Sequence, residues 1–344
     1  MKKVIISVCG IAILFGINAH IFHHKIKKVS TKLENFIDHS VCSGQAQAIE
    51  GEMFREYAAN KIAKLRQGLD AKSNEVLDYV LDAMVYTRFY KNSWWERGNI
   101  SFPKDHIEHM NRWYAEFSLI KNKYNLGGYN EIVPEVFYFH HGLRFANPKV
   151  LNYIKDKDII DCGAYIGDSV LVLREYTDAK IYCYEFSKSN INAFEKVMKL
   201  NSVASSKYVI VPVALGDELG NIHVEEENNA NSGRQLKEGN GYVVKKTTID
   251  EEAKIRNFRV GLIKADVEGD GMRIVKGAIN TIKQHRPVLS LAVYHNTDEL
   301  FGIKPFLENN LKNYVFEFHL QQFELGNFNE MILLCYPKEL LKKE

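Results

Sequence analysis

Two patterns of hydrophobic and polar residues divide this chain of 344 residues. From about residue 30 to residue 126, apolar residues recur every three or four positions, which predicts a series of amphipathic helices. From residue 158 onward, short runs of branched apolar residues alternate with helix-like segments, which is typical of a parallel sheet covered by helices on both faces. We therefore predict a helical region of residues 30–134 and an α/β domain of residues 135–344.

The predicted sheet has seven strands and ends in a hairpin. The last two strands, 314–320 and 331–335, are separated by a short loop in which no helix fits. They are expected to pair antiparallel, because a parallel crossover needs a dozen or more residues. An otherwise parallel, doubly wound sheet with an antiparallel last strand is the Rossmann-like pattern of class I methyltransferases. The earlier strands are expected at the start of the run 158–169 and at residues 180–185, 208–213, 260–266 and 287–294.

One more extended segment is predicted before the sheet, at residues 132–145, through the run Val-Phe-Tyr-Phe. His140 and His141 follow that run. Adjacent side chains on a strand face opposite ways, so a metal ion shared by the two histidines is not expected.

Composition and charge narrow the possible partners. The 45 basic and 43 acidic side chains nearly cancel and form no long run of like charge, so nucleic acid is not a predicted partner. The five cysteines are odd in number and lack any CxxC spacing, which favours reduced, structural thiols over a zinc site or a disulfide framework.

The run 158–169 carries the first chemical signal. It predicts a buried strand, a tight turn and the start of a helix, and in a doubly wound sheet a nucleotide-like ligand binds at that strand end. Gly163 and Gly167 are expected to let the backbone approach the ligand, which a Cβ would prevent. Tyr165 stands where a dinucleotide fingerprint needs its second glycine, so a pyrophosphate could not approach. A nucleoside ligand without a pyrophosphate, such as S-adenosylmethionine, could approach the turn.

The neighbouring residues suit that cofactor. Asp161 and the free N–H groups at the helix start near Asp168 fit the amine and carboxylate of its methionine moiety. Glu185, at the end of the second strand, is placed to accept hydrogen bonds from the ribose hydroxyls. The predicted cofactor site consists of Asp161, Gly163, Ala164, Tyr165, Gly167, Asp168, Ser169, Glu185 and Phe186.

Acidic residues at the end of the fourth strand give the second signal. Asp266 and Glu268 emerge there, facing the same cleft, and carboxylates in such a setting need partners or a use. The alternative is structural, with Lys264 pairing with Asp266 to fix the loop. The fifth strand brings His295 to the same rim, where it is predicted to act as general base on an acceptor hydroxyl, because its pKa lies near working pH. Asp266, Glu268 and His295 are thus the predicted catalytic residues, and no cluster requires a metal.

These motifs resemble those of the FkbM-type S-adenosylmethionine-dependent methyltransferases. The resemblance covers roughly residues 135–340. It implies methylation of a hydroxyl group on a sugar or glycan. The family usually has Asn where Tyr165 stands, Pro where Phe186 stands and Glu where Gly271 stands. The matching motifs are residues 161–169, Glu185, 214–217, 263–269, 276–278, Pro287 and 294–295.

The amino-terminal segment 4–22 is free of formal charge and flanked by lysines on both sides. About 20 apolar residues span a bilayer, so residues 1–29 are predicted to hold a transmembrane anchor, with a cleaved signal peptide or a buried helix as alternatives. The lysine balance leans only slightly toward a cytoplasmic main body. Because S-adenosylmethionine is made in the cytosol, we expect a membrane-anchored protein with a cytoplasmic catalytic domain.

Two regions are expected to face the small-molecule or glycan acceptor. Aromatic side chains are dense between residues 86 and 117, and we predict that they pack the helices onto the catalytic domain. The alternative is an exposed surface that grips substrate, with Trp94 and Trp95 in it. The second region is a polar excursion at 222–244 with short strands around 228–241. The rival to an enzyme is a methyltransferase-fold protein that has lost the chemistry and serves as a glycan-binding or scaffold module. The sequence gives no indication of oligomeric state.

Overall fold

A computed structural model describes residues 58–89, 102–224, 242–323 and 329–342 of the chain. The predicted anchor 4–22, the pair Trp94 and Trp95, and the excursion around 228–241 lie outside these ranges. Among the described residues, no helix combines the length and the apolar character needed to cross a bilayer.

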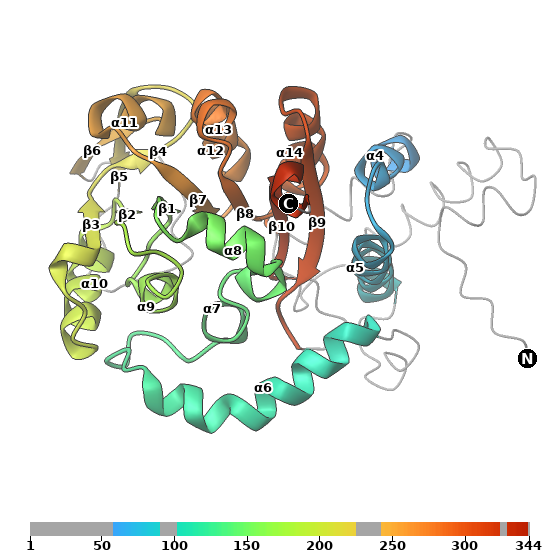
Figure 1. Ribbon diagram of the computed structural model, residues 1–344, viewed down its shortest axis with the longest axis horizontal. Helices are drawn as coiled ribbons and strands as arrows, with labels where there is room; N and C mark the ends of the chain where they lie inside the picture. The colour runs from blue at the N-terminus through green and yellow to red at the C-terminus, as the bar shows by residue number, and fades with distance from the viewer. Residues whose placement is uncertain (1–57, 90–101, 225–241, 324–328, 343–344) are drawn as a thin grey trace, which may run out of the picture.

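A seven-stranded sheet forms the centre of the molecule, in the order β3-β2-β1-β7-β8-β10-β9 (Figure 1). The pairs from β3 to β8 are parallel, whereas β10 is antiparallel to both β8 and β9. The predicted sheet and its closing hairpin are therefore confirmed. The strands are β1 (Asp158–Cys162), β2 (Ile181–Tyr184), β3 (Tyr208–Val211), β7 (Val260–Ala265), β8 (Val288–Ala292), β9 (Tyr314–Leu320) and β10 (Met331–Pro337).

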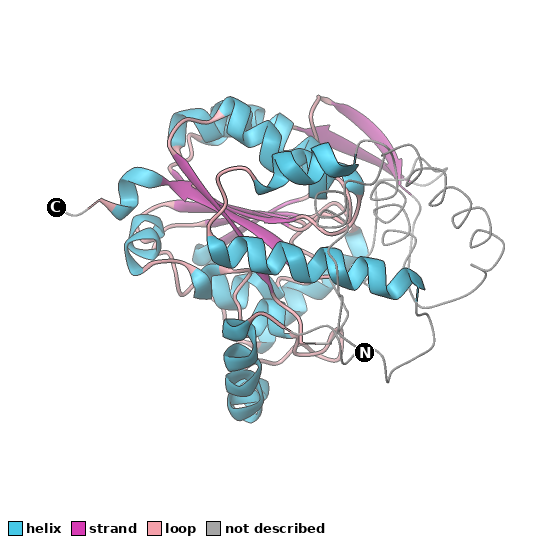
Figure 2. Cartoon of the chain, turned by 90° about the vertical axis from the view of Figure 1, so that its right-hand side faces the viewer, coloured by secondary structure: helices cyan, strands magenta, loops and turns pink. Residues whose placement is uncertain are grey.

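Alternate residues of the central strands enter two different cores. Helices lie on both faces of the sheet (Figure 2). In β1, Ile159 faces one core and Ile160 faces the other. Both faces are covered, so most residues of these strands are apolar. One face is covered by α7 (Pro134–Phe137), α8 (Pro148–Ile154), α9 (Asp168–Leu173) and α10 (Lys188–Leu200). The other is covered by α11 (Ile249–Arg256), α12 (Gly271–Gly277), α13 (Ile279–His285) and α14 (Thr297–Asn310).

The helical region packs on the α/β domain through α4 (Ala58–Arg66), α5 (Ala71–Phe89) and α6 (Lys104–Lys123). Helix α5 lies along the edge strand β9, and Leu77 and Met84 belong to the same core as Leu333. Ser73 Oγ accepts a hydrogen bond from Phe318 N at 3.1 Å, so the helix also satisfies one backbone donor on the open edge of the sheet.

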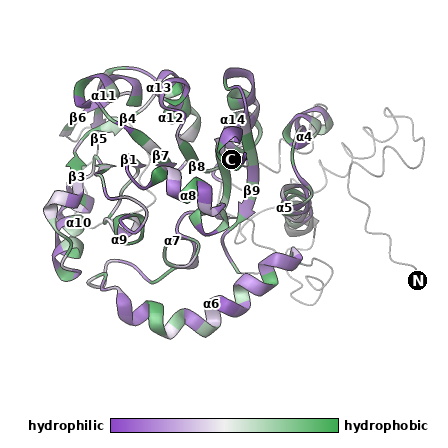
Figure 3. Ribbon diagram, viewed as in Figure 1, coloured by the Kyte–Doolittle hydropathy of each residue, from purple (hydrophilic) through white to green (hydrophobic). Residues whose placement is uncertain are grey.

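Aromatic residues fix α6 to the domain. Trp113 is 6% exposed and packs with Tyr138, Phe139 and Phe323 in a separate aromatic cluster. Hydrophobic and hydrophilic residues alternate along this helix, and Tyr114, beside Trp113, is 66% exposed (Figure 3). In the described part of the aromatic region 86–117, the buried side chain of Trp113 therefore packs α6 onto the domain.

The extended conformation predicted for residues 132–145 is wrong. The segment forms α7, two left-handed residues, His140 and His141, and the 3-10 helix η2 (Leu143–Phe145). Pro134 is well suited to the first turn of a helix. All four residues of the run 136–139 are buried, in two different clusters, and a short apolar run that is buried throughout does not by itself distinguish a strand from a helix.

A second, three-stranded sheet carries the polar excursion. Its order is β4-β6-β5, and β5 and β6 pair antiparallel on either side of residues 225–241. Its strands are β4 (Ala214–Leu215), β5 (Gly220–Val224) and β6 (Tyr242–Thr247). The described cysteines, Cys162, Cys183 and Cys335, are buried free thiols, as predicted.

Candidate active site

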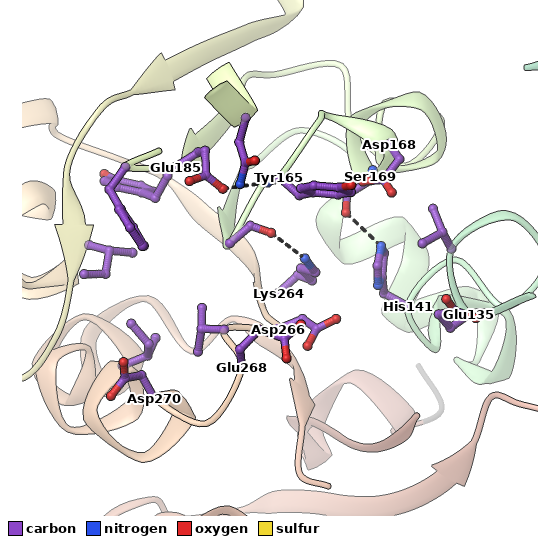
Figure 4. A pocket seen from close by; sticks show the side chains of 18 of the residues that line it. Glu135, His141, Tyr165, Asp168, Ser169, Glu185, Lys264, Asp266, Glu268 and Asp270 are labelled. Carbon is purple, nitrogen blue, oxygen red and sulfur yellow. Dashed lines mark hydrogen bonds between the residues drawn. The ribbon is translucent and has the colours of Figure 1, made fainter. Parts of the chain in front are cut away.

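A cavity of about 270 Å³ opens at the carboxyl ends of β1, β2 and β7. This is where a doubly wound sheet binds its ligands. Most of the predicted site residues line it: Gly163, Tyr165, Asp168, Ser169, Glu185, Phe186, Asp266 and Glu268 (Figure 4). The other predicted residues, Asp161, Ala164, Gly167 and His295, are not in its lining.

Backbone amides hold the carboxylate of Glu185 at the cavity wall. Tyr165 N donates to Oε2 at 3.0 Å, and Ser187 N donates to Oε1 at 2.7 Å. Burial raises the pKa of Glu185, and these hydrogen bonds oppose that shift. Tyr165 reaches Glu185 from a left-handed backbone conformation, with φ of 47°. The prediction that Glu185 stands at the end of β2 beside the glycine turn is confirmed in position.

The two glycines of the turn make room for neighbouring protein atoms, whereas the sequence predicted that they let the backbone approach a ligand. Gly163 has φ of 77°, and a Cβ there would lie 2.2 Å from the carbonyl oxygen of Asp266. Gly167 has φ of 80°, and its Cβ would lie 2.8 Å from Cδ2 of Phe194. The turn can therefore approach the β7 loop and helix α10 only without these side chains.

The amides at the start of α9 are also less available than predicted. Gly167 N donates to Ala164 O at 2.8 Å, and Ser169 N donates to Asp168 Oδ1 at 2.9 Å. Burial raises the pKa of Asp168 to about 6. Because both amides are used inside the turn, the side chain of Asp168, which lines the cavity, is the more accessible group for a ligand.

Asp161 forms a buried ion pair with Lys264, which joins β1 to β7. Lys264 Nζ lies 3.1 Å from Asp161 Oδ1 and donates to Gly163 O at 3.1 Å. Both side chains are almost completely buried. Asp161 therefore neutralises a lysine, and the structure does not support its predicted contact with the methionine moiety. The alternative prediction paired Lys264 with Asp266, but the partner of Lys264 in the structure is Asp161.

Acidic side chains dominate the cavity lining. They are Glu135, Asp168, Glu185, Asp266, Glu268, Asp270 and Glu330. Among the described residues that line the cavity, Lys264 is the one lysine or arginine. The lining as a whole therefore favours a ligand that carries positive charge.

Several of these carboxyl groups titrate near neutral pH. Burial raises the pKa of Glu268 to about 7, and the charge of Asp266 adds to the shift. Burial raises the pKa of Glu135 to about 8, again with a contribution from Asp266. Burial, together with the charge of Glu135, raises the pKa of Glu330 well above its usual value.

The sequence analysis missed Glu135 and Glu330. Glu135 belongs to α7, in the segment that was expected to be extended, and Glu330 comes just before β10. Tyr294 OH donates to Glu330 Oε1 at 2.8 Å, across the ends of β8 and β10. No local motif marks either glutamate, because only the packing of α7 and the final hairpin brings them to the cavity.

His295 lies behind the acidic rim. It is 1% exposed, with Nε2 3.4 Å from Asp266 Oδ1 and 3.6 Å from Glu268 Oε2. Burial lowers the pKa of its imidazole, but Glu299, Asp266 and Glu268 together raise it to about 9. At neutral pH the ring already carries the proton that a general base would have to accept. The structure therefore argues against the predicted role of His295 as general base.

Glu299 was also missed. Its Oε2 lies 2.9 Å from His295 Nδ1, and its Oε1 accepts from Gly271 N at 2.8 Å. A Cβ on Gly271 would lie 2.7 Å from that Oε1, so the carboxylate of Glu299 fills the space that a side chain at 271 would need. The spacing His-x-x-x-Glu across the start of α14 is the sequence signal that could have found it.

His141, weighed earlier only as a metal ligand, lines the cavity. Its Nε2 lies 2.9 Å from Ser169 Oγ. Burial lowers the pKa of His141 well below its usual value, so the ring is neutral. Within the described ranges, no group of three or more His, Cys, Asp or Glu side chains is arranged to hold a metal ion.

Comparisons with known proteins agree with this architecture. The sequence model of the methyltransferase FkbM domain matches residues 161–334, just over half of the chain. The crystal structure of the methyltransferase FkbM from Methylobacillus flagellatus is similar over 84% of this chain, with 17% identity and a TM-score of 0.55, and this chain spans 61% of its length.

Other solved structures are less similar. An rRNA methylase from Streptococcus thermophilus has 8% identity and a TM-score of 0.37, over 61% of this chain and 99% of that one. A putative methyltransferase from Streptococcus mutans, in complex with SAH, has 10% identity and a TM-score of 0.33, over 54% and 93%. No curated protein matches the chain. On the match of the domain across residues 161–334, the chain belongs to the FkbM methyltransferase family.

Proposed function

We propose that this protein is an S-adenosylmethionine-dependent O-methyltransferase that methylates a hydroxyl group of a sugar or glycan. The observation that carries the proposal is the acidic cavity at the strand ends of an FkbM-family domain, with Glu185 fixed in its wall.

The cavity has groups that suit each part of the cofactor. Two backbone amides orient the carboxylate of Glu185, and its remaining lone pairs can accept hydrogen bonds from ribose hydroxyls. Phe186, Val213 and Leu215 offer apolar surface for an adenine ring. When bound, S-adenosylmethionine would supply a methyl group on a positively charged sulfonium, and the acidic lining suits that charge.

Glu268 is the best candidate for the general base. Its side chain lines the cavity, and burial raises its pKa to about 7. At pH 7 about half of the Glu268 carboxyl groups are therefore deprotonated and able to accept a proton. The charged His295 ring, 3.6 Å from Glu268 Oε2, stabilises the carboxylate form. Glu268 can therefore take a proton from an acceptor hydroxyl and release it to solvent.

The same lining supports an uncharged acceptor. Glu135 and Glu330 add acidic groups from α7 and from the start of β10, and an anionic acceptor would be repelled. Carboxyl groups form hydrogen bonds with hydroxyl groups in either protonation state, which is the chemistry that a sugar offers.

Titration calorimetry with S-adenosylmethionine is the first test. We expect saturable one-site binding, and Glu185→Gln should weaken it about tenfold or more, since a hydrogen bond to a charged group contributes about 1.5–3 kcal/mol. Failure of the intact protein to bind the cofactor would contradict the proposal and favour the scaffold alternative.

The acceptor is tested by incubation with methyl-labelled cofactor and host glycan extracts. Label should enter the glycan fraction as an ether that survives mild alkali, whereas a methyl ester would be hydrolysed. Label found only in protein or nucleic acid would contradict a glycan acceptor.

The proposal includes a cytoplasmic catalytic domain held by the segment 4–22, because the cofactor is made in the cytosol. A tag on the carboxyl terminus should be inaccessible to a membrane-impermeant reagent in intact cells. Labelling of the tag in intact cells would contradict this orientation.

A further inference from the structure

The carboxylate of Glu299 connects helix α14 to the acidic rim through three contacts. Glu299 Oε2 lies 2.9 Å from His295 Nδ1 and accepts from His295 N at 3.2 Å. Glu299 Oε1 accepts from Gly271 N at 2.8 Å, at the start of α12. Glu299 and His295 are each 1% exposed, so water does not compete for these bonds.

The other ring nitrogen of His295 faces the cavity rim. Nε2 lies 3.4 Å from Asp266 Oδ1 and 3.6 Å from Glu268 Oε2, and both carboxylates belong to residues that line the cavity. The ring of Tyr294 packs against the imidazole, with centroids 4.0 Å apart. Among the described residues Nε2 has no hydrogen-bond partner, so the Nδ1 contact with Glu299 and the packing of Tyr294 set the orientation of the imidazole.

We propose that Glu299 is a positioning residue of the active site, whose carboxylate orients the His295 imidazole so that Nε2 lies beside the carboxylates of Asp266 and Glu268. The effect on methyl transfer rests on the proposed function, whereas the orientation of the ring does not.

A simpler role for Glu299 would be to stabilise the start of α14. Asn296 already caps that helix, since its side chain accepts from Glu299 N at 2.9 Å and donates to Gly269 O at 2.7 Å. A Glu299 that only stabilised the helix would affect the free energy of unfolding, whereas a Glu299 that orients His295 also determines what His295 contributes to kcat. The two roles can therefore be separated by measuring His295 itself.

The groups that set its ionisation come from every neighbouring element. Glu299 faces Nδ1 from α14, and Asp266 and Glu268 face Nε2 from the loop after β7. Glu330, before β10, also interacts electrostatically with the imidazole. Removing the charge of Glu299 leaves the other three carboxyl groups in place, so the expected change is a downward shift of the titration.

The test is NMR titration of the full-length protein labelled with 15N-histidine. Because the chain has 12 histidines, His295→Asn is used to assign the His295 signals. In the wild type we expect His295 to remain in the imidazolium form up to pH 8. In Glu299→Gln the midpoint of the His295 titration should be at least one pH unit lower. Superimposable titrations of His295 in the two proteins would overturn the proposal.

Glu308→Gln is the matched control. Glu308 lies on the same helix and pairs with the buried Lys304 at 2.7 Å, also at i,i+4 spacing. The variant Glu308→Gln should lower the stability of the protein and leave the His295 titration unchanged. A shift as large as that of Glu299→Gln would show that any loss of charge on α14 suffices, which contradicts the proposal.

A pair of glycine variants tests the same contact without altering Glu299. Gly271→Ala places a Cβ 2.7 Å from Glu299 Oε1 and should lower the His295 titration in the same direction. Gly302→Ala, on α14, meets only the flexible end of Met272 and should have no effect on it. Equal effects of the two variants would argue against a specific contact.

Kinetics provide a double-mutant test. If Glu299 acts through His295, the variant Glu299→Gln/His295→Asn should have the same kcat as His295→Asn alone, with the KM for the cofactor changed less than twofold. Additive losses in kcat would overturn the proposal. If the wild type binds no cofactor, the proposed function fails, and the NMR titration still decides the role of Glu299.

Discussion

The two sides of the cavity are built on different principles. We call them the amide side, comprising Tyr165, Glu185 and Ser187, and the acid side, comprising Glu135, Asp266, Glu268 and Glu330. On the amide side, backbone N–H groups satisfy one carboxylate within 22 residues of sequence. On the acid side, carboxyl groups from three separate segments share a buried space, and burial together with the charge of Asp266 raises the pKa of Glu135, Glu268 and Glu330. The amide side is thus fixed in geometry by backbone hydrogen bonds, whereas Glu135 and Glu268 on the acid side change their charge near neutral pH.

The largest effect is expected where the two sides are joined, at the buried pair of Lys264 and Asp161. Lys264→Met would leave Asp161 buried without its partner, at a cost of about 3–5 kcal/mol in the free energy of unfolding. Denaturant unfolding measures this loss. Lys254→Met, at an exposed pair with Glu251, is the control and should change stability little. Equal losses in the two variants would refute the buried pair as the link.

The next effect concerns the approach of the glycine turn to the β7 loop. Gly163→Ala should cost about 1–2 kcal/mol for the left-handed backbone. The clash with the Asp266 carbonyl, 2.2 Å away, adds about 1–3 kcal/mol. Gly128→Ala is the matched control, because Gly128 also has a left-handed φ, 81°, but no atom within 4 Å of its Cβ position. Thermal unfolding of both variants isolates the clash, and equal losses would show that the two sides do not touch there.

A smaller effect is expected on the pH dependence of cofactor binding. The pKa of Asp168 is raised to about 6 and that of Glu268 to about 7, so both carboxyl groups gain negative charge between pH 5.5 and 8. Affinity for S-adenosylmethionine, measured by calorimetry, should therefore rise with pH by about tenfold, since one pKa unit corresponds to about 1.4 kcal/mol. Its demethylated product lacks the sulfonium charge and should show a smaller change. Glu268→Gln should flatten the profile, and an unchanged slope in this variant would contradict the role of the acid side.

Stability of the free protein should move the opposite way in the same range. An acid whose pKa is raised by folding binds its proton more tightly in the native state, so stability falls as pH rises from its unfolded pKa to its folded one. For Glu268 this window runs from 4.5 to about 7. His295 behaves differently, because its raised pKa stabilises the fold fully below 6.5, and that stabilisation is lost as pH rises through about 9.

The smallest effect is expected at Tyr165 on the amide side. Tyr165→Asn should change cofactor affinity by less than about twofold, because the backbone N–H, and not the side chain, binds Glu185, and Asn tolerates a left-handed backbone. Calorimetry measures this, with Glu185→Gln as the sensitive comparison. A large loss of affinity would show that the aromatic ring itself contacts the ligand.

Residues close in sequence account for what could be predicted of the site. The run 158–169 encodes a strand, a glycine turn and a helix by local rules, and Glu185 follows from the next strand of the same unit. The roles assigned to Asp161 and His295 failed for a different reason. Both residues stand at the expected positions, but each is buried against a charged partner, Lys264 or Glu299, and burial decides what a charged group can do.

The sequence by itself determined the order of strands and helices, the antiparallel closing hairpin and the position of the ligand turn, because these depend on hydrophobic periodicity, loop length and glycine placement. Only the tertiary structure decided which carboxyl groups share the cavity and which of them are charged. Glu135, Glu268 and Glu330 are 62 to 195 residues apart, and their ionisation depends on desolvation and on one another's charge, quantities that exist only once the chain has folded around them.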